Sequence, residues 1–572
     1  MNINRSERNR VFFLFIIFCL WVLFLGGTLL KTQVLDYSKH VKRVQSQSNR
    51  IFTLHPKRGT IYDCSGEILA ISVKAKSAFL SNKNKMESRR LFNRVLRSKI
   101  RFTGKEKKEI RDRIQRGDKF IWLKRKLSDW EYKKLQQIES TTKGKATLDF
   151  LEEYKRIYPQ KTTAAHILGG VGIDEQGLYG IEYSLDSTIR GKGCKVKVEK
   201  DARQKVFSYQ YLDEPVAGRD IYLTIDLSVQ FFVEKELKAT VEKHKAKSGS
   251  VIVMDSRDGA ILAMANYPNF NPADVKYISP KLIKNHAVSF IYHPGSTFKI
   301  VLASTALEKN ICSPQQKFYC CRGVYQVKDR KVYDDHPYDH LSFEDIIIYS
   351  SNIGAAKIGE KLGKKRFYTG IKNFGFGTQT GLRLPGEERG IFNSLNRWSG
   401  VSAAFLAHGY EISVTPLQML RAFNVIASAG YLVQPYIVKK IKGVFLKPPE
   451  KEKILSPGTV HRMKAIMRQV VEKGTGKSAR IEGIPIAAKT GTTKRITRKK
   501  KISNIEVRYV SSFGGFFPAK NPRITVFVVI DDPRGQYYGG DVAAPLFKSI
   551  AEKLMIYLEI FPELDKKNEI RL

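Results

Sequence analysis

The chain is long, rich in core-forming residues and strongly basic. It has 572 residues, of which 42% are hydrophobic, and its formal net charge is +44. This length predicts two or three domains, and the hydrophobic content excludes wholesale disorder. The chain lacks zinc-finger spacing, RNA-binding aromatic motifs and a helix-turn-helix pattern, so we expect no nucleic acid as partner. We interpret the charge as a solvated surface, or as one facing an anionic membrane or polymer.

The first predicted element is an apolar segment from Val11 to Leu30. It carries no charged residue and, at about 1.5 Å per residue, a helix of this length spans about 30 Å of hydrocarbon. Arg5, Arg8 and Arg10 precede it, which by the positive-inside rule keeps residues 1–10 in the cytoplasm. A cleaved signal peptide is the alternative, but the run is long and no A-x-A site follows it. We predict one uncleaved transmembrane helix, with the remainder of the chain outside the membrane.

Two regions of mixed character come next. Residues 31–54 are polar with scattered apolar positions, which favours a helical stalk. Residues 55–215 are basic and mixed, with a strand expected at Ile68–Val73 and a helix around Lys105–Gln115.

The pattern changes from about residue 219, where strands flank a long helical middle. This arrangement predicts a sheet covered by helices over residues 219–560, followed by a loose tail at 561–572. The expected elements are strand Ile221–Ile225, helix Ser228–Lys245, hairpin strands Ser250–Met254 and Ala260–Ala265, strands Val510–Phe517 and Ile524–Ile530, and helix Ala543–Tyr557.

Cysteine and histidine usage argues against a disulfide scaffold and against a metal site. Cys19 lies in the apolar segment, and a bond from Cys312 to Cys320 or Cys321 stays open at this stage. The one metal-like cluster is better explained as a polar loop; its members are Asp334, Asp335, His336, Asp339 and His340.

The first chemical motif is an S-x-x-K sequence that begins at Ser296 and ends at Lys299. Pro294 and Gly295 mark a helix start, so we expect Ser296 in the first turn with Lys299 on the same face. A serine hydroxyl becomes a strong nucleophile when a neighbouring base takes its proton. Lysine can be that base if burial or a nearby cation lowers its pKa. The motif therefore predicts a catalytic nucleophile and its proton acceptor.

Two later motifs strengthen this prediction. An S-S-N sequence at 350–352 combines hydroxyls with an amide before an expected helix, although a helix N-cap would also explain it. A K-T-G-T sequence at 489–492 follows an apolar strand and suits carboxylate binding, although it could be an ordinary strand end. The order S-x-x-K, S-x-N, K-T-G is typical of serine β-lactamases and penicillin-binding proteins. We predict catalytic roles for Ser350 and Asn352. We predict substrate-binding roles for Lys489, Thr490, Gly491 and Thr492.

With these motifs, the chain resembles the class B penicillin-binding proteins over nearly its whole length. Arg58–Asp63, Arg156–Pro159 and Gly177–Glu182 resemble motifs of the family's pedestal domain, and Tyr537–Gly540 resembles the end of its transpeptidase domain. Residues near Leu69–Val73 favour the division-specific branch. Two positions depart from the family pattern, Cys64 and Ala488.

The resemblance implies an α/β (α+β) fold. A transpeptidase domain like that of penicillin-binding proteins and serine β-lactamases, with an antiparallel sheet covered by helices, would occupy residues 219–560. An elongated pedestal domain of the dimerisation type would occupy residues 55–215, after one transmembrane helix. The basic run Lys494–Lys501 resembles an insertion next to the cleft.

The function implied is that of a peptidoglycan D,D-transpeptidase anchored in a bacterial inner membrane with its catalytic domain in the periplasm. It would cross-link stem peptides ending in D-Ala-D-Ala through a Ser296 acyl-enzyme, in septal wall synthesis, and β-lactams would inhibit it covalently. Division or elongation machinery proteins and a glycosyltransferase are the implied partners, with no cofactor and no metal. An elongation-type transpeptidase, a D,D-carboxypeptidase, and a β-lactam sensor or non-catalytic division scaffold stay as alternatives.

Overall fold

The computed structural model describes residues 5–39, 49–82, 84–140, 147–200, 206–498 and 505–561. The chain divides into two compact units. One unit combines Met1–Pro56 with Gly191–Ala217, and the other combines Lys57–Arg190 with Gly218–Leu572.

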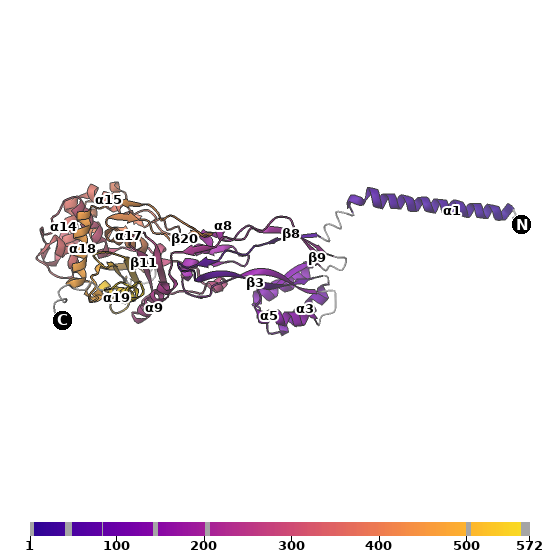
Figure 1. Cartoon of the computed structure of the whole chain (residues 1–572), viewed down its shortest axis with the longest axis horizontal. Helices are drawn as coiled ribbons and strands as arrows, with labels where there is room; N and C mark the ends of the chain where they lie inside the picture. The colour runs from indigo at the N-terminus through magenta and orange to yellow at the C-terminus, as the bar shows by residue number, and fades with distance from the viewer. Residues whose placement is uncertain are drawn as a thin grey trace. The chain divides into compact units, whose positions relative to one another are not determined.

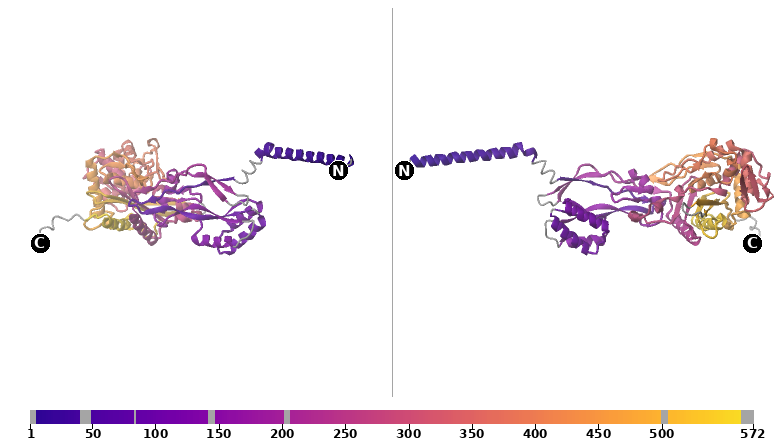
Figure 2. Two further views of the ribbon diagram at one scale, coloured as in Figure 1. Left: turned by 45° about the vertical axis from the view of Figure 1, so that its right-hand side comes forward. Right: turned by 180° about the vertical axis from the view of Figure 1, so that it is seen from behind.

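Helix α1 (Arg5–Leu30) begins the first unit and continues into a π-helical turn at Lys31–Leu35. Figure 2 shows α1 as one continuous helix. The stretch Arg8–Leu35 has a mean hydropathy of 2.6 and, within the described part of the chain, is the one helix long and apolar enough to cross a membrane. The predicted segment Val11–Leu30 lies inside it.

A three-stranded antiparallel sheet completes the first unit, formed by β1 (Asn49–Leu54), β8 (Cys194–Lys200) and β9 (Val206–Tyr211). The prediction of a helical stalk was wrong for Asn49–Leu54, because these residues pair with β8 along their whole length. The part of that prediction at 40–48 lies outside the described residues.

The second unit opens with a mixed region built around the long strand β3. A seven-stranded sheet has the order β21-β20-β10-β2-β3-β4, with β5 also paired to β3. Three of its strands come from later in the chain: β10 (Ile221–Leu223), β20 (Val438–Ile441) and β21 (Val444–Phe445). The predicted strand at Ile68–Val73 is confirmed but extends to Ser81. The elements are β2 (Ile61–Tyr62), β3 (Ile68–Ser81), α3 (Lys85–Arg97), α4 (Gly104–Arg116), β4 (Phe120–Lys124), α5 (Asp129–Ser140), β5 (Thr147–Ile157), α6 (Ala165–Leu168), β6 (Gly170–Val171), β7 (Gly177–Tyr179), α7 (Gly180–Ser184) and α8 (Asp186–Ile189).

Local sequence explains why helix α4 forms where the apolar pattern predicts it. Thr103 caps its first turn and Glu106 returns the hydrogen bond, which satisfies two otherwise unpaired backbone N–H groups. Gly117 ends it with a φ of 87°, a conformation that costs glycine little. Its apolar face packs into a small core with Phe92 of α3 and Leu135 of α5.

The three pedestal motifs meet in one buried ion-pair network. Arg58 Nε lies 2.6 Å from Glu182 Oε2, and Arg156 Nε lies 2.7 Å from Glu182 Oε1. Arg58 also pairs with Asp186 at 2.5 Å. Arg58 and Glu182 have no exposed surface, so these charges neutralise each other without help from water.

The larger domain is built on a five-stranded antiparallel sheet of order β12-β11-β25-β24-β23. Its strands are β11 (Ser248–Asp255), β12 (Ile261–Tyr267), β23 (Ala487–Arg498), β24 (Ile505–Phe517) and β25 (Ile524–Asp531). The predicted hairpin and both late strands are confirmed. Val526, Val528 and Ile530 enter one hydrophobic cluster, whereas Phe527 and Val529 enter another. Both faces of the sheet are therefore buried, which explains the nearly continuous apolar runs.

Helices cover the two faces of this sheet (Figure 1). Helices α9 (Leu227–Lys243) and α19 (Gly539–Tyr557) pack on one face, and both were predicted to within four residues at their ends. The other face carries α12 (Lys299–Glu308), α13 (Phe343–Ile348), α14 (Asn352–Leu362), α15 (Lys364–Asn373), α16 (Ser402–Ala407), α17 (Pro416–Ala427) and α18 (Pro457–Glu472).

Short elements connect these layers. They are β10 (Ile221–Leu223), α10 (Pro280–Ile283), α11 (His286–Ser289), β13 (Lys317–Tyr319), β14 (Val324–Val327), β15 (Arg330–Tyr333), β16 (His340–Ser342), β17 (Ile391–Phe392), β18 (Ile412–Ser413), β19 (Tyr431–Val433), β20 (Val438–Ile441), β21 (Val444–Phe445) and β22 (Lys451–Lys453). All six cysteines lie among the described residues and are free, so the bond that the sequence left open for Cys312 is not formed in this structure.

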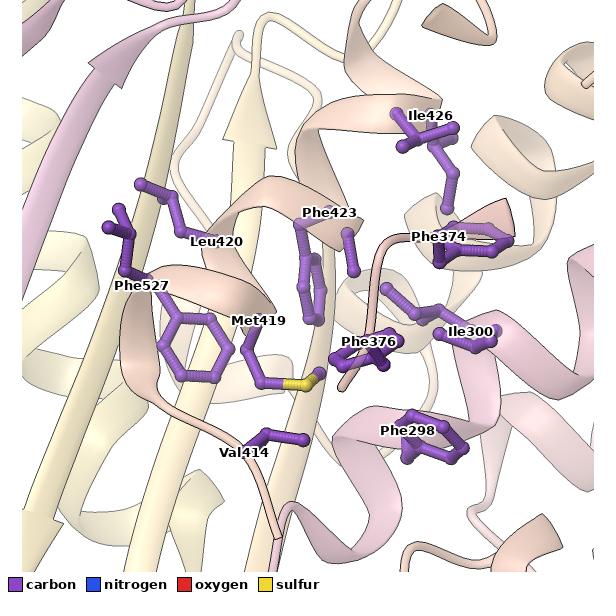
Figure 3. Packing of buried hydrophobic residues seen from close by; sticks show 14 of the residues in the cluster. Phe298, Ile300, Phe374, Phe376, Val414, Met419, Leu420, Phe423, Ile426 and Phe527 are labelled. Carbon is purple, nitrogen blue, oxygen red and sulfur yellow. The ribbon is translucent and has the colours of Figure 1, made fainter. Parts of the chain in front are cut away.

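A dense aromatic core underlies the S-x-x-K segment. Figure 3 shows Phe298 beside Phe376, and their ring centroids are 5.2 Å apart. Phe423 of α17 packs against Phe527 of β25 with centroids 5.6 Å apart. Because interiors are close-packed, this core fixes the start of α12 relative to the sheet.

Candidate active site

Ser296 lies in a 3₁₀ turn, Gly295–Phe298, that leads directly into α12. Gly295 has a φ of 55°, and a Cβ there would lie 2.6 Å from Thr493 Oγ1. Glycine therefore allows the turn to lie close to strand β23. The sequence predicted Ser296 in the first helical turn, and the structure places it one turn earlier.

Lys299 is fully buried and its amine faces Ser296. The distance from Lys299 Nζ to Ser296 Oγ is 3.1 Å. The amine also lies 2.5 Å from Ser350 O, 3.2 Å from Ser350 Oγ and 2.8 Å from Asn352 Oδ1. A charged ammonium has three N–H donors for these four oxygens, whereas a neutral amine can accept the Ser296 proton. The predicted pairing of Ser296 with Lys299 is thus present in the geometry.

Ser350 and Asn352 flank the start of α14. Ser350 has a φ of 66°, an unfavourable conformation for a residue with a side chain and one that clusters at functional sites. Its carbonyl and hydroxyl both face Lys299. Ser351, between them, is the helix N-cap, and its hydroxyl accepts a hydrogen bond from Gly354 N. The N-cap explanation of the motif therefore applies to Ser351, and the two predicted residues face the lysine.

Lys489 comes from strand β23 and reaches the same hydroxyl from the other side. Its Nζ lies 2.9 Å from Ser350 Oγ. The K-T-G motif lies inside β23, so the alternative of a strand end is wrong. A Cβ at Gly491 would lie 2.5 Å from Ser512 Oγ and 2.8 Å from Thr297 Cγ2, so the strand approaches the serine turn only with glycine here.

A cavity of about 720 Å³ opens over these residues. Both lysines lie behind its wall with 0% exposure. The predicted residues that line the cavity are Ser296, Ser350, Asn352, Thr490, Gly491 and Thr492. The structure therefore brings all eight predicted residues together around one cleft.

Burial shifts the protonation equilibria of both lysines. Desolvation lowers the pKa of Lys299 to about 7, against the opposing effect of Asp334 and Asp335. Desolvation lowers the pKa of Lys489 well below its usual value, and repulsion from Lys299 adds to this. An arriving carboxylate would favour the charged form of Lys489. The site can therefore hold a neutral lysine beside Ser296 near neutral pH.

Several further residues of the cleft were not predicted as site residues, although Tyr537 and Tyr538 belong to the motif Tyr537–Gly540. Tyr509 and Tyr537 stack with centroids 4.0 Å apart, and Tyr538 lies beside Tyr537 at 4.7 Å. His408 also lines the cavity; the residue is 5% exposed, and its ring nitrogens have no hydrogen-bond partner from another residue in the described part of the chain. Desolvation and the proximity of Lys299 lower the pKa of His408 to about 3. These residues come together only through the fold.

The basic run predicted as an insertion after the K-T-G strand is partly strand. Lys494–Arg498 belong to β23 and pair with β24, and Lys494 lines the cavity. Residues 499–501 of the run lie outside the described residues. That the run is an insertion next to the cleft stays a prediction.

Comparison with known proteins places this arrangement in a family. Residues 249–552 match the penicillin binding protein transpeptidase domain, and residues 53–223 match the penicillin-binding protein dimerisation domain. The chain belongs to the class B penicillin-binding proteins, which combine these two domains.

Relatives are similar over nearly the whole chain. The probable peptidoglycan D,D-transpeptidase PenA of Neisseria meningitidis is 30% identical over 96% of this chain and 93% of its own length. The peptidoglycan D,D-transpeptidase FtsI of Escherichia coli is 29% identical over 94% of this chain and 90% of its own length. The crystal structure of penicillin-binding protein 3 of Mycobacterium tuberculosis with aztreonam has a TM-score of 0.68 and 25% identity, covering 90% of this chain and 98% of that one.

Proposed function

We propose that the chain is a peptidoglycan D,D-transpeptidase that works through an acyl-enzyme on Ser296. One observation carries the proposal: the buried amine of Lys299, whose pKa is lowered to about 7, lies 3.1 Å from Ser296 Oγ at the base of the cleft. The family and the names of the relatives support peptidoglycan as the substrate.

Acylation begins when Ser296 Oγ attacks the carbonyl carbon of the penultimate D-Ala and passes its proton to Lys299 Nζ. The tetrahedral intermediate collapses, the bond to the terminal D-Ala nitrogen breaks, and that amine leaves with a proton delivered through Ser350. Asn352 holds the donor peptide. Ser350 suits the relay because its hydroxyl lies within 3.2 Å of Lys299 and 2.9 Å of Lys489. The amine of a second stem peptide then attacks the ester, forms the cross-link and releases Ser296.

The strand β23 binds the donor. Lys489 supplies positive charge, and the hydroxyls of Thr490 and Thr492 bind the terminal carboxylate while Gly491 lets the peptide backbone approach. The backbone N–H groups of Ser296 and Thr492 form the oxyanion hole, where each donor contributes roughly 3 kcal/mol to the transition state in enzymes of this type.

The enzyme acts outside a bacterial inner membrane and is held there by α1. The arginines before the apolar segment support this orientation. Residues near Leu69–Val73 favour a role in septal rather than lateral wall synthesis, together with division proteins and a glycosyltransferase. β-Lactams mimic the donor and acylate Ser296; the aztreonam complex of the mycobacterial relative supports this.

The test is intact-mass analysis of the full chain in detergent after incubation with a penicillin. A stable adduct is expected on the wild-type protein and none on Ser296→Ala, with Ser140→Ala as the control that removes the serine of the chain's other S-x-x-K sequence. Rapid loss of the adduct would instead indicate a β-lactamase. Folded wild-type protein without an adduct would indicate a scaffold.

A further inference from the structure

The loop that follows strand β15 contacts the start of α14, next to Ser350 and Asn352 of the active site. Strand β15 (Arg330–Tyr333) pairs with β14, and Val327 and Val332 anchor this hairpin in the main hydrophobic core. Asp334 follows the last residue of the hairpin, so the position of its backbone is fixed by the core. The loop contains the polar cluster that the sequence offered as a metal-like group, and the donor and acylation steps above give it no role.

The Asp334 carboxylate satisfies the exposed backbone groups at the start of α14. Its Oδ1 accepts hydrogen bonds from Asn352 N and, at 3.0 Å, from Ile353 N. Its Oδ2 accepts a hydrogen bond from Ser351 Oγ at 2.6 Å. The first backbone N–H groups of a helix lack internal partners and carry partial positive charge, so a carboxylate there is favourable.

The same short segment also orients the side chain of Asn352. The backbone carbonyl of Tyr333 accepts a hydrogen bond from Asn352 Nδ2 at 2.9 Å. This contact leaves Asn352 Oδ1 directed at Lys299 Nζ, 2.8 Å away. Tyr333 and Asp334 thus hold Asn352 by its side chain and its backbone at once.

We propose that Asp334 is a positioning residue for the acylation reaction: its carboxylate fixes the first turn of α14 and thereby holds Ser350 and Asn352 against Lys299. This inference rests on the proposed function and adds a residue to it. Asp334 does not touch Ser296 or the lysine amine in the described contacts, so it acts through the residues that do.

The carboxylate also sets the charge balance around Lys299. The charged and titratable groups that face this lysine are Asp334 and Asp335 from the loop after β15, Lys489 from β23 and His408 after α16. Burial lowers the pKa of Lys299, and Asp334 opposes that shift. Removing the negative charge therefore lowers the lysine pKa further, and the acid limb of the acylation rate must move to lower pH.

Two substitutions separate the positional effect from the charge effect. Asp334→Asn keeps an oxygen for the backbone N–H groups but loses the charge. We expect its acid limb to move to lower pH, with a loss of less than about tenfold at the plateau. Asp334→Ala loses the charge and the hydrogen bonds, so its acid limb should move as in Asp334→Asn. We expect its acylation rate constant at the plateau to fall roughly 10- to 100-fold, as for a displacement of about 1 Å in an active site.

Two matched variants make the result specific. Asp226→Ala removes another aspartate that caps a helix, since Asp226 Oδ1 accepts from Ser228 N and Val229 N at the start of α9, away from the cavity. It should cost stability without changing acylation. Asp335→Asn removes an exposed charge near Lys299 that makes no hydrogen bond to α14 in the described residues. Its acid limb should move in the same direction as that of Asp334→Asn, and less far.

The experiment measures the second-order rate constant for acylation of the full chain by a fluorescent penicillin from pH 5 to 9, with circular dichroism to verify folding. The expected result is the plateau loss in Asp334→Ala together with the shifted limb in Asp334→Asn. Wild-type rates and pH profiles in both Asp334 variants would overturn this inference alone, as would a limb that moves to higher pH in Asp334→Asn. Wild-type protein that forms no adduct would overturn the proposed function itself.

Discussion

Two regions of this molecule bury basic side chains, and they differ in whether a carboxylate pairs with them. In the pedestal, Arg58 and Arg156 each meet a carboxylate oxygen of Glu182 within 2.7 Å. In the cleft, Lys299 and Lys489 meet hydroxyl, carbonyl and amide oxygens, and among the described residues no carboxylate lies within ion-pair distance of either amine.

The difference distinguishes a charge that stabilises the fold from a charge that takes part in proton transfer. Arginine stays charged at any accessible pH, and its several N–H donors bind different oxygens at once: Arg58 donates to Glu182, Asp186 and the Glu175 carbonyl, so the network holds segments together. Lysine changes its pKa readily when buried, so a lysine without a carboxylate can release its proton near neutral pH. The pedestal thus uses charge to fix three motifs in place, and the cleft uses it to move protons.

Replacing the cleft lysine should give the largest effect. We expect Lys299→Met to lower the penicillin acylation rate constant about 10³-fold or more, because a positioned general base contributes typically 10²- to 10⁴-fold. Thermal unfolding should occur at or above the wild-type temperature, since an apolar side chain suits the buried site. Lys309→Met, exposed at the end of α12, is the control. Acylation within tenfold of wild type would contradict the role of Lys299.

Replacing the pedestal arginine Arg58 should instead lower the stability of the protein. Arg58→Met leaves Glu182 buried with one partner fewer, and we expect the free energy of unfolding to fall by about 3–5 kcal/mol in urea titrations. The pair of Arg257, whose side chain is exposed, with Asp255 supplies the control, because Arg257→Met should cost less than about 1 kcal/mol. A loss of that same small size for Arg58→Met would show that the network is not structural.

The pH dependence of acylation sharpens the comparison without a mutation. Burial lowers the pKa of Lys299 to about 7, so the neutral form increases as pH rises through 7. We expect the rate constant to approach a tenfold fall per pH unit well below that midpoint, hence to fall about 50-fold from pH 7 to pH 5. A rate constant that is flat over this range, from protein that stays folded, would contradict a titrating lysine.

The smallest expected effect tests packing behind Lys489. Ala488 pairs with Gly515 in β24, and a Cβ at Gly515 would lie 2.7 Å from the Ala488 Cβ. Gly515→Ala should therefore lower the free energy of unfolding by about 1–3 kcal/mol, as overpacking does.

The double variant Gly515→Ala/Ala488→Gly provides the control for this packing effect. It should recover part of the lost stability, as expected for residues in contact. Equal stability of Gly515→Ala and wild type would show that the strand pair adjusts without cost.

Much of this architecture could be predicted from periodicity. The nearly continuous apolar run at Ile524–Ile530 appears as β25 because that strand is buried on both faces, and the helical pattern at Ser228–Lys245 appears as α9 because one face of the helix is buried. The prediction for Asn49–Leu54 was wrong because these six residues show no clear period of their own and become a strand by pairing with β8, which lies far away in the sequence.

In the site, too, local spacing could be predicted and contacts between distant segments could not. Ser296 with Lys299 could be predicted because local helical spacing brings them together, and the other motifs followed from their order along the chain. Asp334 could not, because it reaches Asn352 only after the β14–β15 hairpin folds back onto α14. His408 and Tyr509 likewise enter the cleft from α16 and β24, and nothing in their local sequence indicates this.

The most direct test of the central claim follows a natural-type substrate rather than a drug. The full chain in detergent would be incubated with a stem pentapeptide ending in D-Ala-D-Ala and a labelled D-amino acid as acceptor, alongside Ser296→Ala, with products read by mass spectrometry. A transpeptidase exchanges the terminal D-Ala for the label in wild-type protein and not in the variant. Release of D-Ala without incorporation of the label, or exchange that persists in Ser296→Ala, would contradict the account.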